Sequence, residues 1–234
     1  MKFSIIIPIY KEKKNLAKLI FNISKTLQKL KKNYEIIFVD DDSNDGSFEE
    51  YKKFKIENTR FLIRRTKPRD LSKSVVFGFN KAKYNNLVVM DGDLQHRPKD
   101  LKNLIEKFKE GNCDIVIGSR NMKNHKTVNL NPFRFYVSKF LNQFTNLLFG
   151  LNLKDPMAGF FIIKKKIFKK SEKKLFLQGF KILLDIVISS PRNIKINEVF
   201  INFNNRNEGF SKMRLKIIFQ LILFIFAKYF SFEK

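Results

Sequence analysis

The sequence contains one cysteine, Cys113, among its 234 residues. A single thiol excludes an internal disulfide and any metal site built from a cluster of cysteines. Cys113 begins an apolar run and is expected to be a small core residue. Long apolar runs are also missing, because the most apolar stretch, residues 217–226, is shorter than the roughly 20 residues that a membrane-spanning helix needs.

Several sequence signals are absent as well. The apolar run at residues 3–7 is too short for a secretory signal peptide and turns polar at once. The expected compartment is therefore the cytoplasm or the cytoplasmic face of a membrane. We find no zinc-finger spacing, no RNA-recognition signature, no glycine-flanked phosphate loop, no internal repeat and no clear linker.

Acidic residues are few, with 22 against 47 lysines and arginines, so the net charge is +25. Such an excess suits an anionic partner, which could be nucleic acid, an acidic membrane face or a phosphorylated substrate. Because no nucleic-acid signature accompanies the charge, we expect a phosphorylated substrate and a membrane surface rather than nucleic acid. Part of the excess reflects a composition rich in lysine.

The length and the 44% hydrophobic content predict one well-packed domain. Strands buried on both faces are expected at residues 3–7, 35–39, 61–63, 87–90 and 114–118, and helices at 16–30, 72–82 and 100–108. This alternation is typical of an α/β fold with a mostly parallel central sheet flanked by helices and right-handed crossovers. The second half predicts a polar loop at 121–132, a helix at 133–149, a tight loop at 155–161 entering a short strand, a helix at 180–188 and a strand at 199–203.

Carboxylates follow two of the predicted strands. Asp91 and Asp93 come directly after the strand at 87–90, and in an extended segment alternate residues share one side, on which Gln95 comes next. Oxygen ligands of this kind suit Mg²⁺ or Mn²⁺. The alternative is an acidic turn in which Asp93 only caps the next helix. The second cluster, residues 40–47, has four carboxylates within six residues; capping explains one or two of them, and we favour a loop that contacts a ligand.

The tail predicts a helix over residues 213–234 that is apolar on nearly all sides between Lys216 and Lys228. One interpretation is a core helix. The other is an interfacial helix that lies among lipid headgroups, with its lysines attracted to anionic lipid. The net charge and the position at the chain end favour membrane contact.

Three motifs in this order resemble the inverting family 2 glycosyltransferases with the GT-A fold: residues 5–12, 39–47 and 91–98. The second half is similar to the polyprenol-phosphate branch of that family, which includes dolichol-phosphate mannose synthases. The matching pieces are Gly118 to Arg120, Arg134 with Ser138, Asp155 to Phe160, and Arg206 to Lys212. The resemblance covers most of the chain, to about residue 226.

The resemblance implies a single GT-A domain over residues 1–212, with a nucleotide-sugar half (1–120) and an acceptor half (121–212). The implied donor is GDP-mannose or UDP-glucose, and the acceptor is a dolichyl or undecaprenyl phosphate that displaces the nucleotide with inversion. Attachment to the cytoplasmic side of a membrane would be peripheral or through a small membrane-protein partner.

The implied site residues fall into four groups. The nucleotide sugar would contact Pro8, Tyr10, Glu12, Asp40, Asp42 and Asp91. Mg²⁺ or Mn²⁺ would bind Asp91, Asp93 and Gln95. The acceptor phosphate would contact Arg134, Ser138, Arg206 and Lys212. The catalytic residues would be Asp93, Arg120, Arg134 and Arg206.

Two alternatives remain open. A family 2 transferase acting on a sugar hydroxyl of a cell-envelope glycan would need a carboxylate base, and Asp155 or Asp185 could serve. A non-catalytic basic protein that binds membrane or nucleic acid would keep its activity in Asp91→Ala. His96 and His125 are expected to cap or to face solvent rather than to catalyse.

Overall fold

The computed structural model of the chain describes residues 1–28, 33–54, 56–120, 132–179, 181–202 and 223–229, without the side chains of 132–134. Its strands are β1 (Phe3–Ile9), β2 (Tyr34–Asp40), β3 (Thr59–Ile63), β4 (Asn86–Val89), β5 (Ile115–Arg120), β6 (Phe161–Lys164) and β7 (Ile196–Ile201). Its helices are α1 (Lys13–Leu27), α2 (Ser47–Lys52), α3 (Leu71–Lys81), α4 (Asp100–Lys109), α5 (Pro132–Phe149), α6 (Lys165–Ser171), the 3-10 helix η2 (Glu172–Lys174), α7 (Ile182–Ser189) and a C-terminal helix at 223–229.

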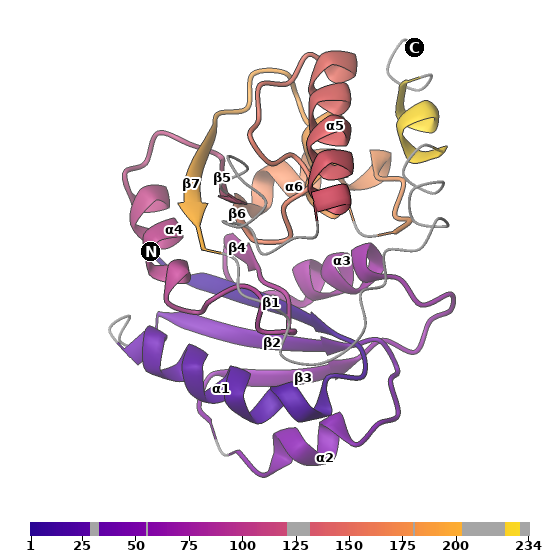
Figure 1. Cartoon of the computed structure of the whole chain (residues 1–234). Coiled ribbons are helices and arrows are strands. Elements are labelled where there is room, and N and C mark those ends of the chain that lie inside the picture. The colour runs from indigo at the N-terminus through magenta and orange to yellow at the C-terminus, as the bar shows by residue number, and fades with distance from the viewer. Residues whose placement is uncertain (29–32, 55, 121–131, 180, 203–222, 230–234) are drawn as a thin grey trace.

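The strands form one sheet in the order β3-β2-β1-β4-β6-β5-β7 (Figure 1). Every described pairing is parallel except those of β6, which runs antiparallel to β4 and β5. The predicted α/β fold with a mostly parallel sheet is therefore confirmed. Because β6 lies between β4 and β5, residues after 120 complete the same sheet that the first half begins.

Helices cover both faces of the sheet. On one face, α1 and α4 pack their apolar stripes against alternate residues of β1, among them Phe3, Ile5 and Ile7. On the other face, α3, α6 and α7 pack against the intervening residues, such as Ile6. This alternation follows from the two-residue period of a strand, and it explains why the strands read as continuous apolar runs.

Pro8 lies inside β1, beyond the bounds of 3–7 that we predicted for this strand. The carbonyl of Ile6 accepts a hydrogen bond from the Met90 N–H, so the backbone polar groups of Ile6 point toward β4. Two residues later, the backbone nitrogen of Pro8 points the same way. β4 pairs with β1 only as far as Ile6, whereas β2 pairs along the whole of β1. Pro8 therefore needs no N–H there, and the strand continues past it.

The C-terminal helix packs on the body of the domain. Phe224 and Ile225 are buried in a cluster with Phe149 and Leu184, and Lys228 forms a buried ion pair with Asp185, Nζ to Oδ1 2.6 Å. Leu223 and Phe226 are exposed. The rest of the predicted tail helix lies outside the described residues. Within the described part of the chain, no helix is both long enough and apolar enough to cross a membrane.

Candidate active site

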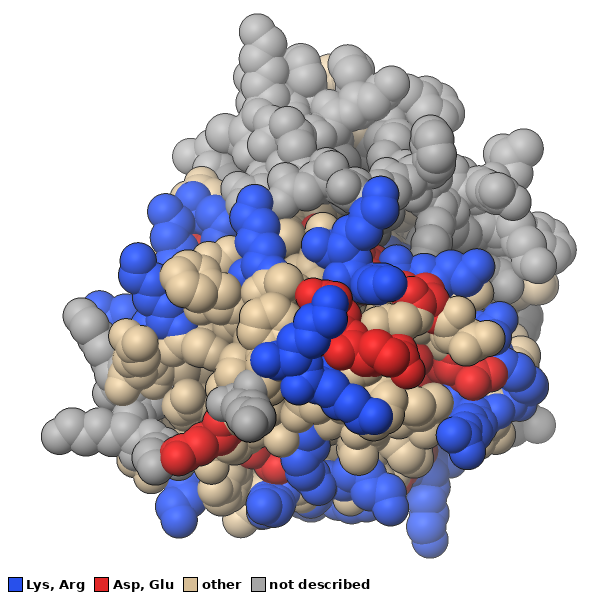
Figure 2. Space-filling view, turned by 90° about the horizontal axis from the view of Figure 1, so that it is seen from below, with Lys and Arg blue, Asp and Glu red and all other residues tan. Residues whose placement is uncertain are grey.

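Three sequence motifs meet at one edge of the sheet. β2, β1 and β4 are neighbours and run parallel, so the residues that follow them gather at their carboxyl ends. These are Tyr10 and Glu12 after β1, the acidic turn 41–47 after β2, and the turn 90–98 after β4. Ligands of open α/β sheets bind at this edge. On the face seen in Figure 2, most of the visible acidic side chains gather near the centre among lysines and arginines.

The segment after β4 is a tight turn and not the extended strand that our sequence argument assumed. Leu94 has a left-handed backbone, φ 63°, and Asp93 Oδ1 accepts a hydrogen bond from the Gln95 N–H at 3.1 Å. Alternation along a strand is therefore the wrong reason for grouping Asp91 with Asp93. In this turn both carboxylates lie near His96, with Asp93 buried and Asp91 partly exposed.

His96 holds this turn from inside the protein. Its side chain is buried and lies 5.2 Å, between ring centroids, from Phe160, so our expectation that it caps a helix or faces solvent is wrong. Burial lowers the pKa of His96 to about 4, and its Nδ1 accepts a hydrogen bond from the Asp91 N–H at 3.3 Å. The ring is therefore neutral at pH 7. The 3.6 Å approach of Nδ1 to the Asp91 carboxylate is not an ion pair.

Gly159 makes room for the Asp91 carboxylate. A β-carbon added to Gly159 would lie 2.7 Å from Asp91 Oδ2, which is closer than atoms can approach without displacement. Gly159 belongs to the loop between Asp155 and β6, so a loop from the second half of the chain forms one wall around a carboxylate of the first half. The two carboxylates and the nearby Gln95 amide form a set of hard oxygen donors that fits Mg²⁺ or Mn²⁺.

Arg120 ends β5 and is held by Asp155. Its guanidinium donates two hydrogen bonds to the carboxylate, Nε to Oδ2 at 2.7 Å and Nη2 to Oδ1 at 2.9 Å. Burial alone would raise the pKa of Asp155, but the charge and hydrogen bonds of Arg120 outweigh it and hold that pKa below its usual value. The negative charge of Asp91 also acts on Arg120. A fixed cation therefore lies within electrostatic range of Asp91.

Lys181 adds a second cation to this group. It precedes α7, and enclosure by the protein together with the charge of Arg120 lowers its pKa to about 8. The charges of Asp155 and Asp91 act in the opposite direction, so Lys181 lies within electrostatic range of all three side chains. At pH 7 it is protonated for the most part.

The acidic turn after β2 is built differently from what the sequence suggested. Asp40 accepts from the Ser43 N–H and hydroxyl, and Asp45 accepts from the Ser47 N–H and hydroxyl. Asp41 forms a buried ion pair with Arg64, and Asp42 pairs with Lys67 at 2.6 Å. Each carboxylate has a partner inside the protein, so the cluster by itself does not require a ligand. Burial raises the pKa of Asp40, whereas the Lys67 hydrogen bond lowers the pKa of Asp42.

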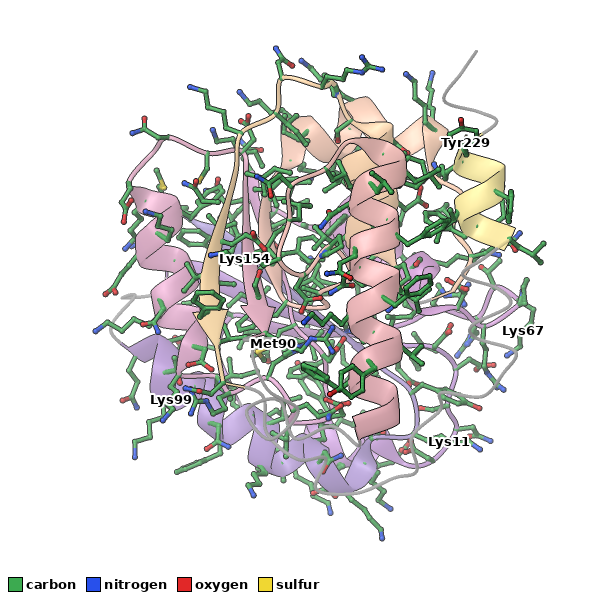
Figure 3. The ribbon with its side chains drawn as sticks, turned by 45° about the horizontal axis from the view of Figure 1, so that its top comes forward. Lys11, Lys67, Met90, Lys99, Lys154 and Tyr229 are labelled. Carbon is green, nitrogen blue, oxygen red and sulfur yellow. The ribbon has the colours of Figure 1, made fainter. Side chains whose placement is uncertain are left out.

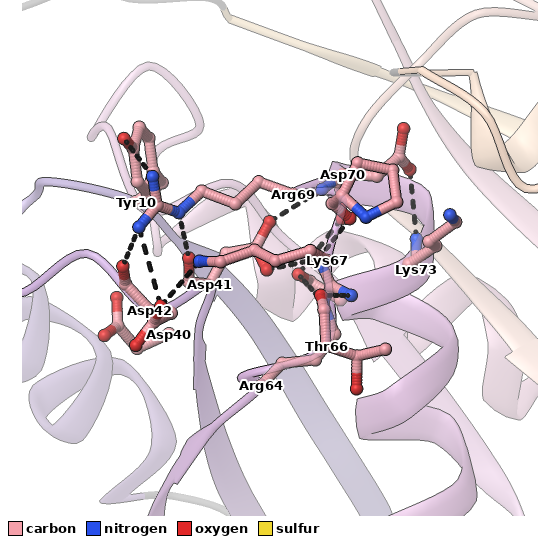
Figure 4. Close-up of polar contacts among 12 residues, drawn as sticks. Tyr10, Asp40, Asp41, Asp42, Arg64, Thr66, Lys67, Arg69, Asp70 and Lys73 are labelled. Carbon is pink, nitrogen blue, oxygen red and sulfur yellow. Dashed lines mark hydrogen bonds and ion pairs between the residues drawn. The ribbon is translucent and has the colours of Figure 1, made fainter.

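Residues 64–69 form a basic loop that lies beside this acidic turn (Figure 4). The Arg69 guanidinium lies 5.2 Å from the centroid of the Tyr10 ring and donates to the Asp42 carbonyl at 2.7 Å. The next residue, Asp70, caps α3 by accepting from the Lys73 N–H, and it also accepts from the Gly179 N–H at 2.5 Å. The acidic turn and the basic loop are therefore tied to the segment that leads into Lys181.

Comparisons with known proteins agree with this arrangement. The model of a family described as glycosyl transferase family 2 matches residues 4–171. This chain belongs to glycosyltransferase family 2.

Two curated relatives resemble this family 2 chain over nearly its whole length. A dolichol-phosphate mannosyltransferase of Pyrococcus furiosus is 40% identical over 228 residues, which cover 97% of this chain and 63% of that protein. The chain thus spans less than two thirds of that relative. A dolichol-phosphate mannosyltransferase of Saccharomyces cerevisiae is 33% identical, covering 95% of this chain and 85% of that one.

Solved structures confirm the GT-A fold. Glucosyl-3-phosphoglycerate synthase from Mycobacterium tuberculosis, crystallised with Mn²⁺, UDP-glucose and phosphoglyceric acid, superposes with a TM-score of 0.72 at 13% identity, over 99% of this chain and 79% of that one. The same enzyme crystallised with UDP gives a TM-score of 0.72 at 15% identity. At this identity the likeness concerns the fold alone.

The structure brings some predicted residues of the family 2 site together and leaves others undescribed. Asp91, Asp93 and Gln95 follow β4, and Arg120 ends β5 on the other side of β6. Ser138 is half-buried on α5. Pro8 is buried in β1, and Glu12 accepts a hydrogen bond from the Asn15 amide at the start of α1. The side chain of Arg134, and Arg206, Lys212 and His125 entirely, lie outside the described residues.

Sequence reasoning missed Lys181, Asp70 and Arg69. Lys181 stands among residues that read as a plain apolar helix, and only the fold brings it to Arg120. Asp70 preceding a helical pattern was a recognisable capping signal. Arg69 lies in a basic loop whose charges alone gave no indication of which one reaches Tyr10.

Proposed function

We propose that this family 2 glycosyltransferase moves mannose from a nucleoside-diphosphate mannose to a polyprenyl phosphate such as dolichyl phosphate. The observation that carries the proposal is the pair of cations, Arg120 and Lys181, within electrostatic range of the Asp91 carboxylate. A reaction between two anions, a nucleotide sugar and a lipid phosphate, needs positive charge between them. The names of the curated relatives support the same substrates.

On the donor side, Asp91, Asp93 and Gln95 would hold Mg²⁺ or Mn²⁺. When bound, the ion would neutralise the charge that builds up on the departing nucleoside diphosphate. Tyr10 and Arg69 offer a flat ring and a guanidinium beside the acidic turn, which suits a nucleoside. The assignment of Asp40 and Asp42 to the base or ribose, with Pro8 and Glu12 shaping the pocket, stays a prediction.

On the acceptor side, the phosphate oxygen is already anionic near neutral pH and needs little help from a general base. Arg120 would draw that oxygen toward the sugar, with Asp155 keeping its guanidinium in a fixed orientation. Ser138 on α5 would donate a hydrogen bond, and Arg134, Arg206 and Lys212 are proposed to complete the phosphate site. Direct displacement at the anomeric carbon would give a β-linked product from an α-linked donor.

A sugar hydroxyl as acceptor is less well supported, because it would need a carboxylate free to take a proton. Asp155 is engaged by two hydrogen bonds from Arg120, and its pKa is lowered. Asp185 is paired with Lys228 and accepts hydrogen bonds from the Phe176 and Leu177 N–H groups. Neither carboxylate is suited to act as a base.

The test is a transfer assay with purified protein and Mn²⁺ or Mg²⁺. GDP-mannose and UDP-glucose are presented separately, each with and without a short polyprenyl phosphate, and sugar is measured in the organic phase. We expect lipid-linked mannose that disappears with chelator and in Asp93→Ala. Glu106→Ala, which removes an exposed carboxylate on α4, is the matched control and should retain activity. Metal-dependent nucleotide binding without any lipid product would refute the acceptor assignment.

A further inference from the structure

The outer face of α5 carries a stripe of large apolar side chains. Tyr136, Phe140, Phe144 and Leu147 are 65%, 64%, 40% and 84% exposed. Their spacing of four, four and three residues places them on one side of the helix, and the Phe140 and Phe144 rings stack with centroids 6.1 Å apart. We call these four residues the α5 stripe. An exposed apolar face of this extent marks a site of interaction, whereas single exposed apolar residues do not.

The C-terminal helix adds to the apolar surface on this half of the molecule. α5 and the C-terminal helix both stand in the upper half of Figure 1, and Leu141 and Leu148 of α5 pack against the same cluster as Phe224 and Ile225. Leu223 and Phe226 remain 49% and 55% exposed. Of the nine large apolar side chains that are exposed in the described part of the chain, six belong to these two helices.

The inner face of α5 reaches the candidate active site. The Asn142 amide donates to the Lys154 carbonyl at 3.4 Å, and the Asn146 amide donates to the Leu153 carbonyl at 2.6 Å. Lys154 is followed by Asp155, which accepts hydrogen bonds from Arg120. An α-helix with its side chains is about 10–12 Å across, so the stripe and the segment beside the site are separated by one helix.

The charge of this surface identifies its partner. α5 contains no aspartate or glutamate, and neither does the segment 223–229. Lys139 is exposed beside the stripe, and the whole chain carries a net charge of +25. An apolar stripe flanked by positive charge and free of carboxylates suits the headgroup region of an anionic bilayer, where aromatic rings are buried and lysines meet anionic lipid.

We propose that the α5 stripe, together with Leu223 and Phe226, docks the protein on the surface of an anionic lipid bilayer. Docking on this side would hold the Arg120–Asp155 segment about one helix diameter from the lipid surface. The proposal rests on the proposed function, because a polyprenyl phosphate presents its phosphate at that depth. Figure 3 shows Tyr229 of the C-terminal helix near the top of the molecule and Lys11 toward its lower right.

The first experiment is co-sedimentation with vesicles of phosphatidylcholine, with and without phosphatidylserine. We expect the wild type to bind the anionic vesicles and Phe140→Gln/Phe144→Gln to bind about tenfold or more weakly. Phe21→Gln is the matched control, since Phe21 is 65% exposed on α1, on the opposite side of Figure 1, and it should bind as the wild type does. Equal binding by the stripe variant would overturn the proposal. The proposal would also be overturned if the wild type formed a dimer that the stripe variant loses, and if neither protein bound vesicles.

A second measurement does not depend on how well the double variant folds. Leu147→Cys and Phe21→Cys each receive an environment-sensitive fluorophore, and the native Cys113 is buried and does not compete. Anionic vesicles should shift the emission of the Leu147 label to shorter wavelength and leave the Phe21 label unchanged. No shift at Leu147, or an equal shift at both positions, would contradict docking through the stripe.

A transfer assay separates this proposal from the proposed function. The stripe variant should lose about tenfold in transfer to a long polyprenyl phosphate embedded in vesicles and should retain wild-type transfer to a short acceptor in solution. No transfer to either acceptor by the wild type would refute the proposed function. Equal loss with both acceptors, or no loss with either, would refute the docking surface.

Discussion

Replacement of Lys228 by methionine tests whether the C-terminal helix is a built-in part of the domain. Lys228 is 7% exposed, and its Nζ contacts Asp185 Oδ1 at 2.6 Å, the Ser189 hydroxyl at 2.7 Å and the Lys174 carbonyl at 2.5 Å. Methionine keeps most of the apolar stem and removes the charge. Asp185 would then remain buried without its counter-ion.

The expected loss follows from this geometry. Removing one partner of a buried ion pair costs about 3–5 kcal/mol of unfolding free energy. Asp185 retains hydrogen bonds from the N–H groups of Phe176 and Leu177, at 2.8 and 3.1 Å, and these moderate the cost. We therefore expect a loss of about 3 kcal/mol, which corresponds to a fall of roughly 6–12 °C in Tm for a domain of this size.

Thermal and urea unfolding followed by circular dichroism measure this loss. Lys173→Met is the matched control, because Lys173 is exposed and its replacement should change the free energy of unfolding by less than about 0.5 kcal/mol. The double variant Asp185→Asn/Lys228→Met should lose less unfolding free energy than the two single variants lose together, since the uncompensated charge is gone. A loss below about 1 kcal/mol in Lys228→Met would refute the reasoning and show that the helix is not anchored by this pair.

Four further predictions concern the site. Lys181 has a pKa of about 8, so the transfer rate should fall as pH rises through that value, and Lys181→Arg should move the fall to higher pH. The pKa of His96 is about 4 instead of 6.5, so between these pH values the imidazole is protonated in the unfolded chain and neutral in the folded one. The free energy of unfolding should therefore drop by up to about 3 kcal/mol as pH falls through this window. Urea unfolding at pH 7 and pH 5 should show about 2 kcal/mol of that drop in the wild type and a smaller one in His96→Gln. Gly159→Ala should weaken Mn²⁺ binding about ten- to a hundredfold, measured by electron paramagnetic resonance with nucleotide present, because the new methyl displaces the Asp91 carboxylate without unfolding the chain. Lys11 has a left-handed φ of 58°, so Lys11→Asn should raise the free energy of unfolding by about 0.5–1 kcal/mol in urea titrations.

The sequence predicted the α/β class, the strand–helix alternation and the carboxylates at the ends of β2 and β4. Each of these depends on a short-range pattern. Continuous apolar runs mark strands buried on both faces, and chain direction brings the ends of parallel strands to one edge. The family resemblance added Arg120 and the order of the motifs, which residue patterns alone could not supply.

Local patterns failed where the answer depended on a neighbour distant in the chain. Pro8 was expected to lie beyond the end of β1, but whether a proline is tolerated depended on where β4 stops. His96 was expected near solvent, but Phe160 covers it. The acidic turn after β2 stays a predicted ligand loop, but its local pattern gave no sign that Arg64 and Lys67 from beyond β3 pair with Asp41 and Asp42.

The sequence by itself thus determined most of the strands and helices and where the acidic turns follow them, because those features arise from the period of neighbouring side chains; α6 and the start of β7 were not predicted. Only the tertiary structure decided which charges meet: Arg120 with Asp155, and Lys228 with Asp185. It also decided which face of α5 is left exposed. Pairings between residues tens of positions apart, and the exposure of one helix face, depend on how the whole chain packs around the sheet.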